Sequence, residues 1–450
     1  MTAGQYTYEQ QHIASPPANF WSRLKYLGPG FILSASIVGS GELIATTTLG
    51  ARAGFVTFWV IIISCLIKVM LQIEFAKHTI LSGKTPMQVF NRMPGMRIKN
   101  SHWSVWFFFI LMLTKMLQLG GIIGGVAIIL NMSFPSISIT LFAILLAPLV
   151  ALLIYRGYYQ FIEKFSLLMI GLFTIFTFIC LIFLKYTPYA ITADQIWQGL
   201  QFQLPPAAVA VAIGAFGITG VGGDEIIAYN YWCLEKGYAS KTGINNHTDA
   251  WEKRARGWIR VMQLDAVAAM IVYTVMTAAF YLLGAAVLHA SGDLPEGYAM
   301  IESLSRMYTE SLGPGAKVFF MLGAFMVLFS TLFAALAAWT RQFSDVFGQL
   351  GWIDFFDNKE RAKSIAILSW TFPFLWSLIF IFIKLPVAMV IAGGIITSII
   401  LLLVIWVIIH LRYKQLPSNF KPKLTYDLLL WISIVVTIAI AVYGLVQIWA

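Results

Sequence analysis

Three carboxylates lie beside glycines inside long apolar runs, where a carboxylate is costly unless it serves an ion or substrate pathway. Glu42 belongs to the stretch VGSGELI, and Asp224 and Glu225 belong to the stretch VGGDEII. Glycine permits an interrupted helix, which frees backbone carbonyl and N–H groups as ligands for a solute. The two stretches therefore predict a binding site for an ion or small solute.

The three carboxylates are the candidate metal ligands, directly or through water. The full set of candidate binding residues is Gly39, Ser40, Gly41, Glu42, Gly220, Val221, Gly222, Gly223, Asp224 and Glu225.

Two other interpretations of the same residues remain open. Acidic side chains in the first turn of a helix stabilise it by capping and through the helix dipole, which we expect to account for one of the three. The glycines could instead mediate close helix contacts of the small-xxx-small kind. Packing alone does not require recurring glutamates, so we expect Glu42 and at least one of Asp224 and Glu225 to face a cavity.

The elements that must position these residues are membrane helices. The chain has 450 residues, of which 59% are hydrophobic and 11% charged, about half the charged fraction of a soluble domain. Apolar runs of about 20 residues recur along its whole length. This pattern predicts an all-α polytopic membrane protein with eleven transmembrane helices. The expected spans have approximate cores at 28–52, 55–77, 104–131, 137–155, 160–184, 206–233, 258–288, 314–340, 364–383, 386–411 and 426–449.

The two glycine-rich stretches repeat one pattern five spans apart. Because five is odd, the two copies enter the membrane from opposite sides. This predicts an inverted repeat of five plus five helices of the LeuT type, in which the first helix of each repeat (helices 1 and 6) is broken. The expected divisions are an N-terminal cytoplasmic tail at 1–20, a first repeat at 21–188, an inverted second repeat at 189–412 and an additional C-terminal helix at 413–450.

Loop charges predict the orientation. Most loop lysines and arginines fall on the same side as the N-terminus, which the positive-inside rule assigns to the cytoplasm. We expect a multi-pass protein of the inner (plasma) membrane with its C-terminus outside. The net charge of +10 follows from this topology and requires no nucleic-acid partner. The expected partners are the lipid bilayer and a small inorganic ion, and we expect a monomer.

Other charged residues also lie within the spans. Lys115 and Gln118 in span 3 are candidate pathway residues. We expect Lys115 to neutralise a carboxylate of a helix break, although it could also repel cations or attract an anion. Glu74 and Asp265 lie near the cytoplasmic ends of their spans, where they could reach water or pair with loop cations.

Span 1 reads GPGFILSASIVGSGELIATTTLGARAGFVTFWV. In its Gly-Pro-x-Phe start and its closing Ala-x-x-Gly-(Tyr/Phe)-x-x-x-Trp-Val pattern it resembles the first helix of the Nramp family of divalent-metal transporters. LQIEFAKHTILSGKTP is similar to the family's Gln-x-x-x-Ala-Lys followed by Thr/Ser-Gly-Lys. The layout of the spans also resembles the family, but specific residues do so only before residue 90 and around span 6.

The resemblance implies a metal site that this chain has altered. The family's breaks are Asp-Pro-Gly-Asn in helix 1 and Met-Pro-His in helix 6. Here Gly39 stands at the aspartate position and Glu42 at the asparagine position, while Val221 and Gly223 lie near the methionine and histidine positions. The thioether that favours transition metals is gone, and glycines in place of bulky ligands imply a wider, more hydrated cavity.

The proton pathway that the resemblance implies is altered as well. The acidic positions of the family's helix 3 correspond to the region of Gln118 and Gly121, which has no acid. The chain therefore resembles the Nramp-related branch associated with magnesium more than the proton-coupled iron and manganese transporters.

These observations favour a secondary transporter of hard divalent cations, Mg²⁺ and Mn²⁺, by alternating access and without proton coupling, because both ions accept oxygen ligands. The alternative is transport of a small organic acid, an amino acid or an anion such as bicarbonate, since GSGE is similar to the Gly-Ser-Gly-Ile break of amino-acid transporters. A non-transporting sensor on the same scaffold is a third interpretation. No nucleophile–base or nucleotide-binding motif occurs, so we expect neither an enzyme nor a resident cofactor.

Overall fold

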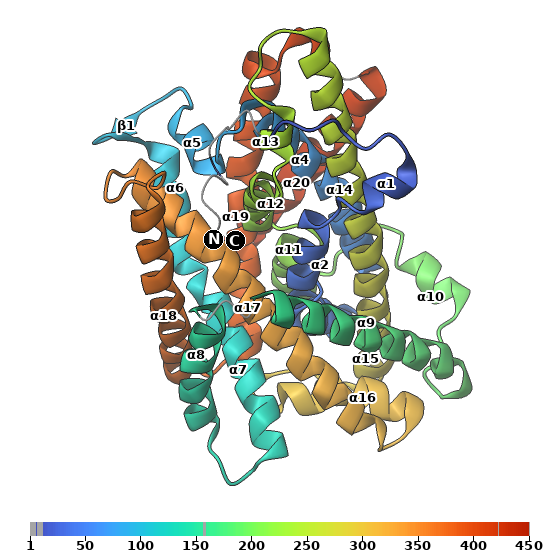
Figure 1. Ribbon diagram of the computed structural model, residues 1–450. Coiled ribbons are helices and arrows are strands. Elements are labelled where there is room, and N and C mark those ends of the chain that lie inside the picture. Colours follow the sequence, from blue (N-terminus) through green and yellow to red (C-terminus); the bar gives the residue numbers. More distant parts are fainter. Residues whose placement is uncertain (1–5, 7–11, 156–158, 422, 450) are drawn as a thin grey trace.

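The computed structural model describes residues 1–450 except 1–5, 7–11, 156–158, 422 and 450. Much of the expected tail at 1–20 therefore lies outside the described residues. The described chain is almost entirely helical, and its long helices pack side by side in one bundle (Figure 1).

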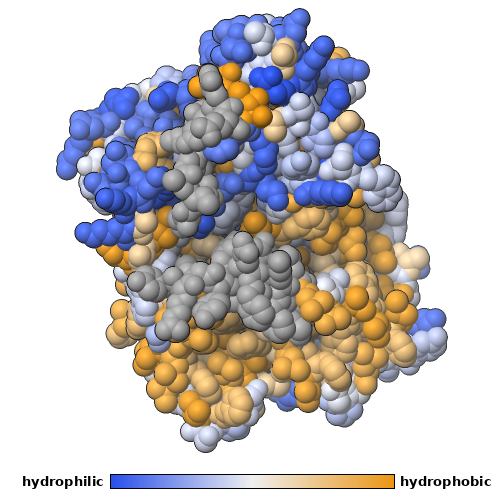
Figure 2. All heavy atoms as spheres, viewed as in Figure 1, coloured by the Kyte–Doolittle hydropathy of each residue, from blue (hydrophilic) through white to orange (hydrophobic). Residues whose placement is uncertain are grey.

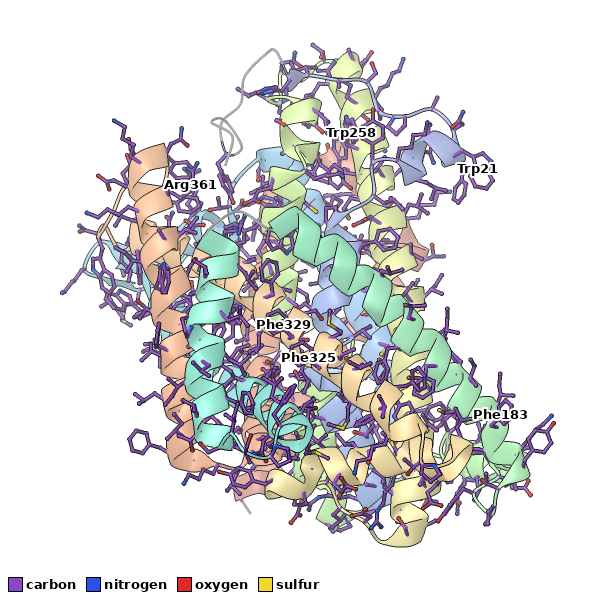
Figure 3. All side chains as sticks on the ribbon, turned by 60° about the horizontal axis from the view of Figure 1, so that its bottom comes forward. Trp21, Phe183, Trp258, Phe325, Phe329 and Arg361 are labelled. Carbon is purple, nitrogen blue, oxygen red and sulfur yellow. The ribbon has the colours of Figure 1, made fainter. Side chains whose placement is uncertain are left out.

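The long helices fall at the predicted spans. They are α4 (Phe58–Ser82), α6 (Trp103–Thr114), α7 (Met116–Ser133), α8 (Ile139–Tyr155), α9 (Tyr159–Phe183), α14 (Asp249–Leu283), α17 (Ala316–Gln349), α18 (Asn358–Ile383), α19 (Pro386–His410) and α20 (Leu424–Trp449). α9 runs obliquely across its neighbours and ends at Phe183 (Figures 1 and 3).

Short elements connect the long helices. They are α1 (Phe20–Leu24), α5 (Pro86–Asn91), η3 (Leu184–Tyr186), α10 (Ala193–Gln198), η4 (Pro206–Ala208), α13 (Tyr238–Thr242), η5 (Gly284–Leu288), α15 (His289–Ser291), η6 (Gly297–Ala299), α16 (Met300–Leu312), η7 (Leu411–Gln415) and η8 (Ser418–Phe420). The antiparallel strands β1 (Arg97–Ile98) and β2 (Ser101–His102) form a small hairpin before α6.

The surface has the distribution expected of a membrane protein. Hydrophilic residues gather at one end of the molecule, and a broad hydrophobic region covers most of the rest of the face in Figure 2. Within the described residues, eight helices are long and apolar enough to cross a bilayer, and two shorter apolar segments lie at Ile139–Leu153 and Gly171–Tyr186. Helices occupy all eleven predicted positions, but the number that cross a membrane stays a prediction, as do the proposed domain boundaries.

The two predicted helix interruptions are confirmed. α2 (Pro29–Ile37) ends before a turn at residues 38–39, after which the chain becomes helical again at Ser40 and the π-helix η2 (Gly41–Thr46) continues into α3 (Thr47–Ala53). α11 (Val209–Ile218) and α12 (Gly223–Glu235) are separated by residues 219–222. Gly220 has φ +67°, a backbone conformation that favours glycine, so the break after α11 depends on this residue.

Glu74 and Asp265, the carboxylates expected near the ends of their spans, both accept hydrogen bonds. Glu74 accepts hydrogen bonds from Lys77 at 2.6 Å and Arg412 at 3.1 Å, so the expected pairing with a cation is confirmed. Asp265 on α14 instead accepts the backbone N–H groups of Gly28 (2.8 Å) and Gly30 (2.5 Å). It therefore caps the N-terminal end of α2 and attaches that half-helix to α14.

Backbone contact between α11 and α19 holds the second interrupted helix in the bundle. A Cβ atom on Gly217 would lie 1.9 Å from the carbonyl oxygen of Gly394, which leaves no room for a side chain. Glycine is therefore a packing requirement at position 217.

We expect Gly217→Ala to destabilise the protein by about 1 to 3 kcal/mol, because α11 and α19 must separate to admit the methyl group. The matched control is Gly171→Ala in α9, where an added Cβ would meet no atom within 4 Å. That change should leave stability unchanged or raise it slightly through helix propensity. Thermal unfolding of both purified variants in detergent tests this, and equal unfolding midpoints would contradict the packing argument.

Candidate functional site

A cavity lies where the two interrupted helices meet. It is lined by residues of α2, η2, α7, α11, α12 and α17, together with Ser40 and Lys115. Its volume of about 40 Å³ is room for roughly three water molecules, or for a small ion with part of its water shell. The polar residues of the lining are Ser36, Ser40, Lys115, Gln118, Asp224, Glu225, Thr331 and Gln342.

Glu42 and Glu225 perform the same local task in the two breaks. The backbone N–H of Gly39 donates to Glu42 Oε2 at 3.2 Å, and that of Gly222 donates to Glu225 Oε2 at 2.7 Å. In both cases a glutamate accepts from the glycine three residues before it. The repeated sequence pattern therefore corresponds to a repeated capping interaction, which accounts for two carboxylates where the sequence suggested one.

The two glutamates differ in their access to the cavity. Glu42 is completely buried, and its second oxygen accepts from Thr277 Oγ1 of α14 at 3.0 Å. It is not among the residues that line the cavity, so its expected position facing the cavity stays a prediction. Glu225 is only partly buried and does line the cavity, as expected for one of the pair at 224 and 225.

Lys115 and Asp224 form a buried ion pair at the cavity wall. Lys115 Nζ donates to Asp224 Oδ1, and the two residues are 3% and 4% exposed. The predicted neutralisation of a helix-break carboxylate by Lys115 is confirmed. Lys115 occupies the single-residue junction between α6 and α7, an irregularity that the sequence analysis did not predict.

Two glutamines contribute acceptors that lack a donor. Gln118 and Gln342 both line the cavity, and within the described part of the chain neither side-chain oxygen has a hydrogen-bond partner. The Gln342 amide nitrogen donates to the Asp224 carbonyl at 3.0 Å, which leaves its oxygen as the free group. Buried acceptors without donors indicate a place for water or a cation.

Gln342 lines the cavity but was not among the sequence candidates. Its detectable signal was a polar side chain near the end of a predicted apolar span. Lys68, a charged residue within span 2, was likewise not among the sequence candidates. In the structure it contacts carbonyl oxygens of the α11 break.

Most of the break glycines do not enlarge the cavity. A Cβ atom on Gly39 would lie 1.8 Å from Thr331 Oγ1, and one on Gly223 would lie 2.7 Å from the Leu401 backbone nitrogen. Helices α17 and α19 therefore fill the space that glycine vacates. These two glycines therefore give no support to the expected widening of the cavity, which stays a prediction.

The sequence candidates thus divide into two groups. Ser40, Gly41, Lys115, Gln118, Asp224 and Glu225 line the cavity. Gly39, Glu42, Gly220, Val221, Gly222 and Gly223 lie in the breaks but outside the lining. Their part in binding stays a prediction.

The described residues contain no group of three or more histidine, cysteine, aspartate or glutamate side chains that could hold a metal ion. One partly exposed carboxylate, two amide oxygens and nearby hydroxyls suit a partly hydrated ion that takes oxygen ligands.

Comparison with known sequences matches this chain to a family model and to named transporters. A family model described as natural resistance-associated macrophage protein-like (Nramp) matches residues 30–447. The divalent metal cation transporter MntH of Xanthomonas campestris is 27% identical over 313 residues, which cover 67% of this chain and 65% of that protein. MntH of Bradyrhizobium diazoefficiens is 24% identical over 330 residues, with 72% and 69% covered.

Solved structures show the same fold. The manganese transporter of Eremococcus coleocola, in complex with an aromatic bis-isothiourea compound, superposes with a TM-score of 0.68 at 17% identity, covering 99% of this chain and 92% of that chain. Mhp1, a nucleobase-cation-symport-1 family transporter, superposes with a TM-score of 0.57 at 14% identity, covering 93% and 91%. The chain therefore has the LeuT-type fold predicted from its repeat, with helices 1 and 6 broken.

We expect strong coupling between Lys115 and Asp224 in a double-mutant cycle. Lys115→Met and Asp224→Asn should each cost about 3 to 5 kcal/mol of unfolding free energy, because each leaves a buried partner unpaired. The double variant should cost clearly less than the two together. Denaturant titration in mixed micelles measures these values.

The exposed pair Lys317–Glu302 provides the matched control, because its side chains are 37% and 52% exposed. Its cycle should show coupling of at most about 1 kcal/mol. Additive effects at Lys115 and Asp224 would contradict a stabilising ion pair.

Proposed function

The chain belongs to the natural resistance-associated macrophage protein-like (Nramp) family, and from that premise we propose that it transports hard divalent cations, Mg²⁺ and Mn²⁺, by alternating access. The named activities of the MntH relatives and of the structural neighbour from Eremococcus coleocola support divalent metals as the substrate class. The protein is a multi-pass membrane protein, and we propose the inner (plasma) membrane, with the N-terminus cytoplasmic and the C-terminus outside.

One observation carries the proposal: the cavity between the breaks presents oxygen acceptors that lack donors. Glu225 is its partly exposed carboxylate, and Gln118 and Gln342 add amide oxygens without partners in the described chain. Lys115 and Asp224 neutralise one another. The net charge that remains in the lining is negative, which favours a cation.

The same geometry weighs against an anionic substrate. In the alternative function, N–H groups at the start of a half-helix would hold the carboxylate of an organic acid or amino acid. Here Glu42 already accepts from Gly39 and Glu225 already accepts from Gly222. A substrate carboxylate would have to displace a glutamate of the protein and would meet its negative charge.

The ion would keep part of its hydration shell. Mg²⁺ sheds its waters reluctantly and usually takes only one or two protein carboxylates, which fits Glu225 as the direct carboxylate ligand. Mn²⁺ accepts the same oxygen ligands. Glu42, which lies outside the lining, holds the first break in shape.

The membrane potential suffices to drive entry of a divalent ion. It contributes about 4 to 5 kcal/mol for two charges at 100 mV. Proton coupling is not required by the lining, because Gln118 stands where the resemblance places an acid and Asp224 is paired with Lys115.

Proteoliposomes with an inside-negative potential test the substrate and the carboxylate. We expect saturable uptake of Mn²⁺ and Mg²⁺, reduced roughly 10- to 100-fold by Glu225→Gln, because the loss of a charged ligand costs about 1.5 to 3 kcal/mol. Glu42→Gln should reduce uptake less. An ion-sensitive dye inside the vesicles measures the rates.

The control for these variants is Glu310→Gln, which changes an exposed glutamate of α16 and should leave uptake unchanged. Uptake of amino acids or bicarbonate in place of divalent ions would refute the proposal. Equal rates in wild type and Glu225→Gln would remove that residue from the pathway.

We also expect no proton movement with the ion. A pH-sensitive dye inside the same vesicles should show no acidification during Mn²⁺ uptake, and an imposed pH gradient without a potential should not drive uptake. An ionophore that carries protons provides the positive control. Acidification that depends on Mn²⁺ would show that a proton route exists despite Gln118.

A further inference from the structure

Lys68 is a fully buried lysine whose ammonium group contacts the break between α11 and α12. Its Nζ donates to the carbonyl oxygens of Phe216 and Thr219, each at 2.6 Å, and lies 4.9 Å from the centre of the Phe216 ring. The Gly217 carbonyl lies at 3.5 Å. The residue belongs to α4, so one helix of the bundle inserts a charge into the break of another.

These carbonyls are groups that the interruption leaves free. The last carbonyls of a helix have no intrahelical partner and carry its negative dipole end. In an interrupted membrane helix, such carbonyls commonly coordinate a monovalent cation. Lys68 supplies a positive charge at this position without any free ion.

The rest of the site is also built for a cation. Ser64 Oγ, one turn before Lys68, lies 2.9 Å from the Phe216 carbonyl and 2.8 Å from the Thr219 carbonyl. A Cβ atom on Gly220 would lie 2.9 Å from the Cα of Cys65, so the break packs directly on α4. The Ser64 hydroxyl and the Lys68 ammonium group therefore donate to the same two carbonyl oxygens.

Lys68 differs from the other lysine near the breaks, and the second break differs from the first. No carboxylate among the described residues forms a salt bridge with Lys68, whereas Lys115 is paired with Asp224. No lysine of the described chain donates to the end of α2, the equivalent half-helix of the first repeat. The Lys68 ammonium group thus contacts only the second break, and its hydrogen-bond acceptors there are neutral carbonyl oxygens.

We propose that Lys68 is a built-in substitute for a monovalent cation, bound in a carbonyl and hydroxyl site formed by Phe216, Thr219 and Ser64. The side chain keeps the α11 break in its binding conformation, so no free Na⁺ or K⁺ is needed there. Lys68 is a positioning residue, since it does not line the cavity. Only the consequence for transport rests on the proposed function.

The test removes the lysine side chain and supplies a free cation in its place. Lys68→Ala should have a lower thermal unfolding midpoint than wild type in choline chloride. NaCl or methylammonium chloride at the same ionic strength should raise that midpoint by about 2 to 5 °C, because a ligand that binds only the folded state stabilises it. This measurement needs no divalent ion, so it stands whether or not the proposed transport function is correct.

Three further proteins control the experiment. Lys68→Met fills the space without a charge and should respond little to any cation, as should wild type. Lys317→Ala removes an exposed lysine and should behave as wild type. A Lys68→Ala midpoint that is equal in choline, sodium and methylammonium would overturn the proposal.

A second measurement keeps the proposal testable if Lys68→Ala does not fold. Wild-type divalent uptake should proceed at the same rate in sodium, potassium and choline media, because the charge is already present. A wild type that is stabilised by Na⁺, or that requires it for uptake, would show that Lys68 does not replace the free cation.

Discussion

The structure depends on how two helices can be interrupted in an apolar interior. Each interruption exposes N–H groups on one side and carbonyl groups on the other, and each unsatisfied group costs several kcal/mol away from water. Glu42 and Glu225 satisfy the N–H groups at matching positions of the two repeats. Lys68 and Ser64 satisfy the carbonyls that end α11.

These contacts determine which carboxylates remain available to a solute. Glu42 accepts hydrogen bonds from Gly39 of the first break and from Thr277, and Asp224 is paired with Lys115. The carboxylate that remains partly exposed at the cavity is Glu225. A single such carboxylate with amide oxygens around it favours a weakly held, partly hydrated cation over a tightly coordinated metal. Weak binding suits a transporter, because the ion must also be released.

Close backbone packing gives the breaks their shape. Gly39 contacts α17, and Gly217 and Gly223 contact α19, at distances that exclude a side chain. These glycines therefore serve the approach of neighbouring helices more than the size of the cavity. Replacement of a bulky residue by glycine widens a site only if no other element moves into the space, and here two helices occupy it.

The sequence alone determined the features that depend on local pattern and on the bilayer. Apolar runs and paired glycine stretches were enough to place the helices, both interruptions and the LeuT-type fold, because lipid imposes length and hydrogen-bond rules on each segment separately. Tertiary structure decided which polar groups meet. Glu42 turns to Thr277, Lys68 reaches the α11 carbonyls and Gln342 joins the cavity because of helices far away in the chain. The rotation of each helix about its own axis sets these contacts, and in a bundle whose helices are apolar nearly all round only packing against neighbours fixes that rotation.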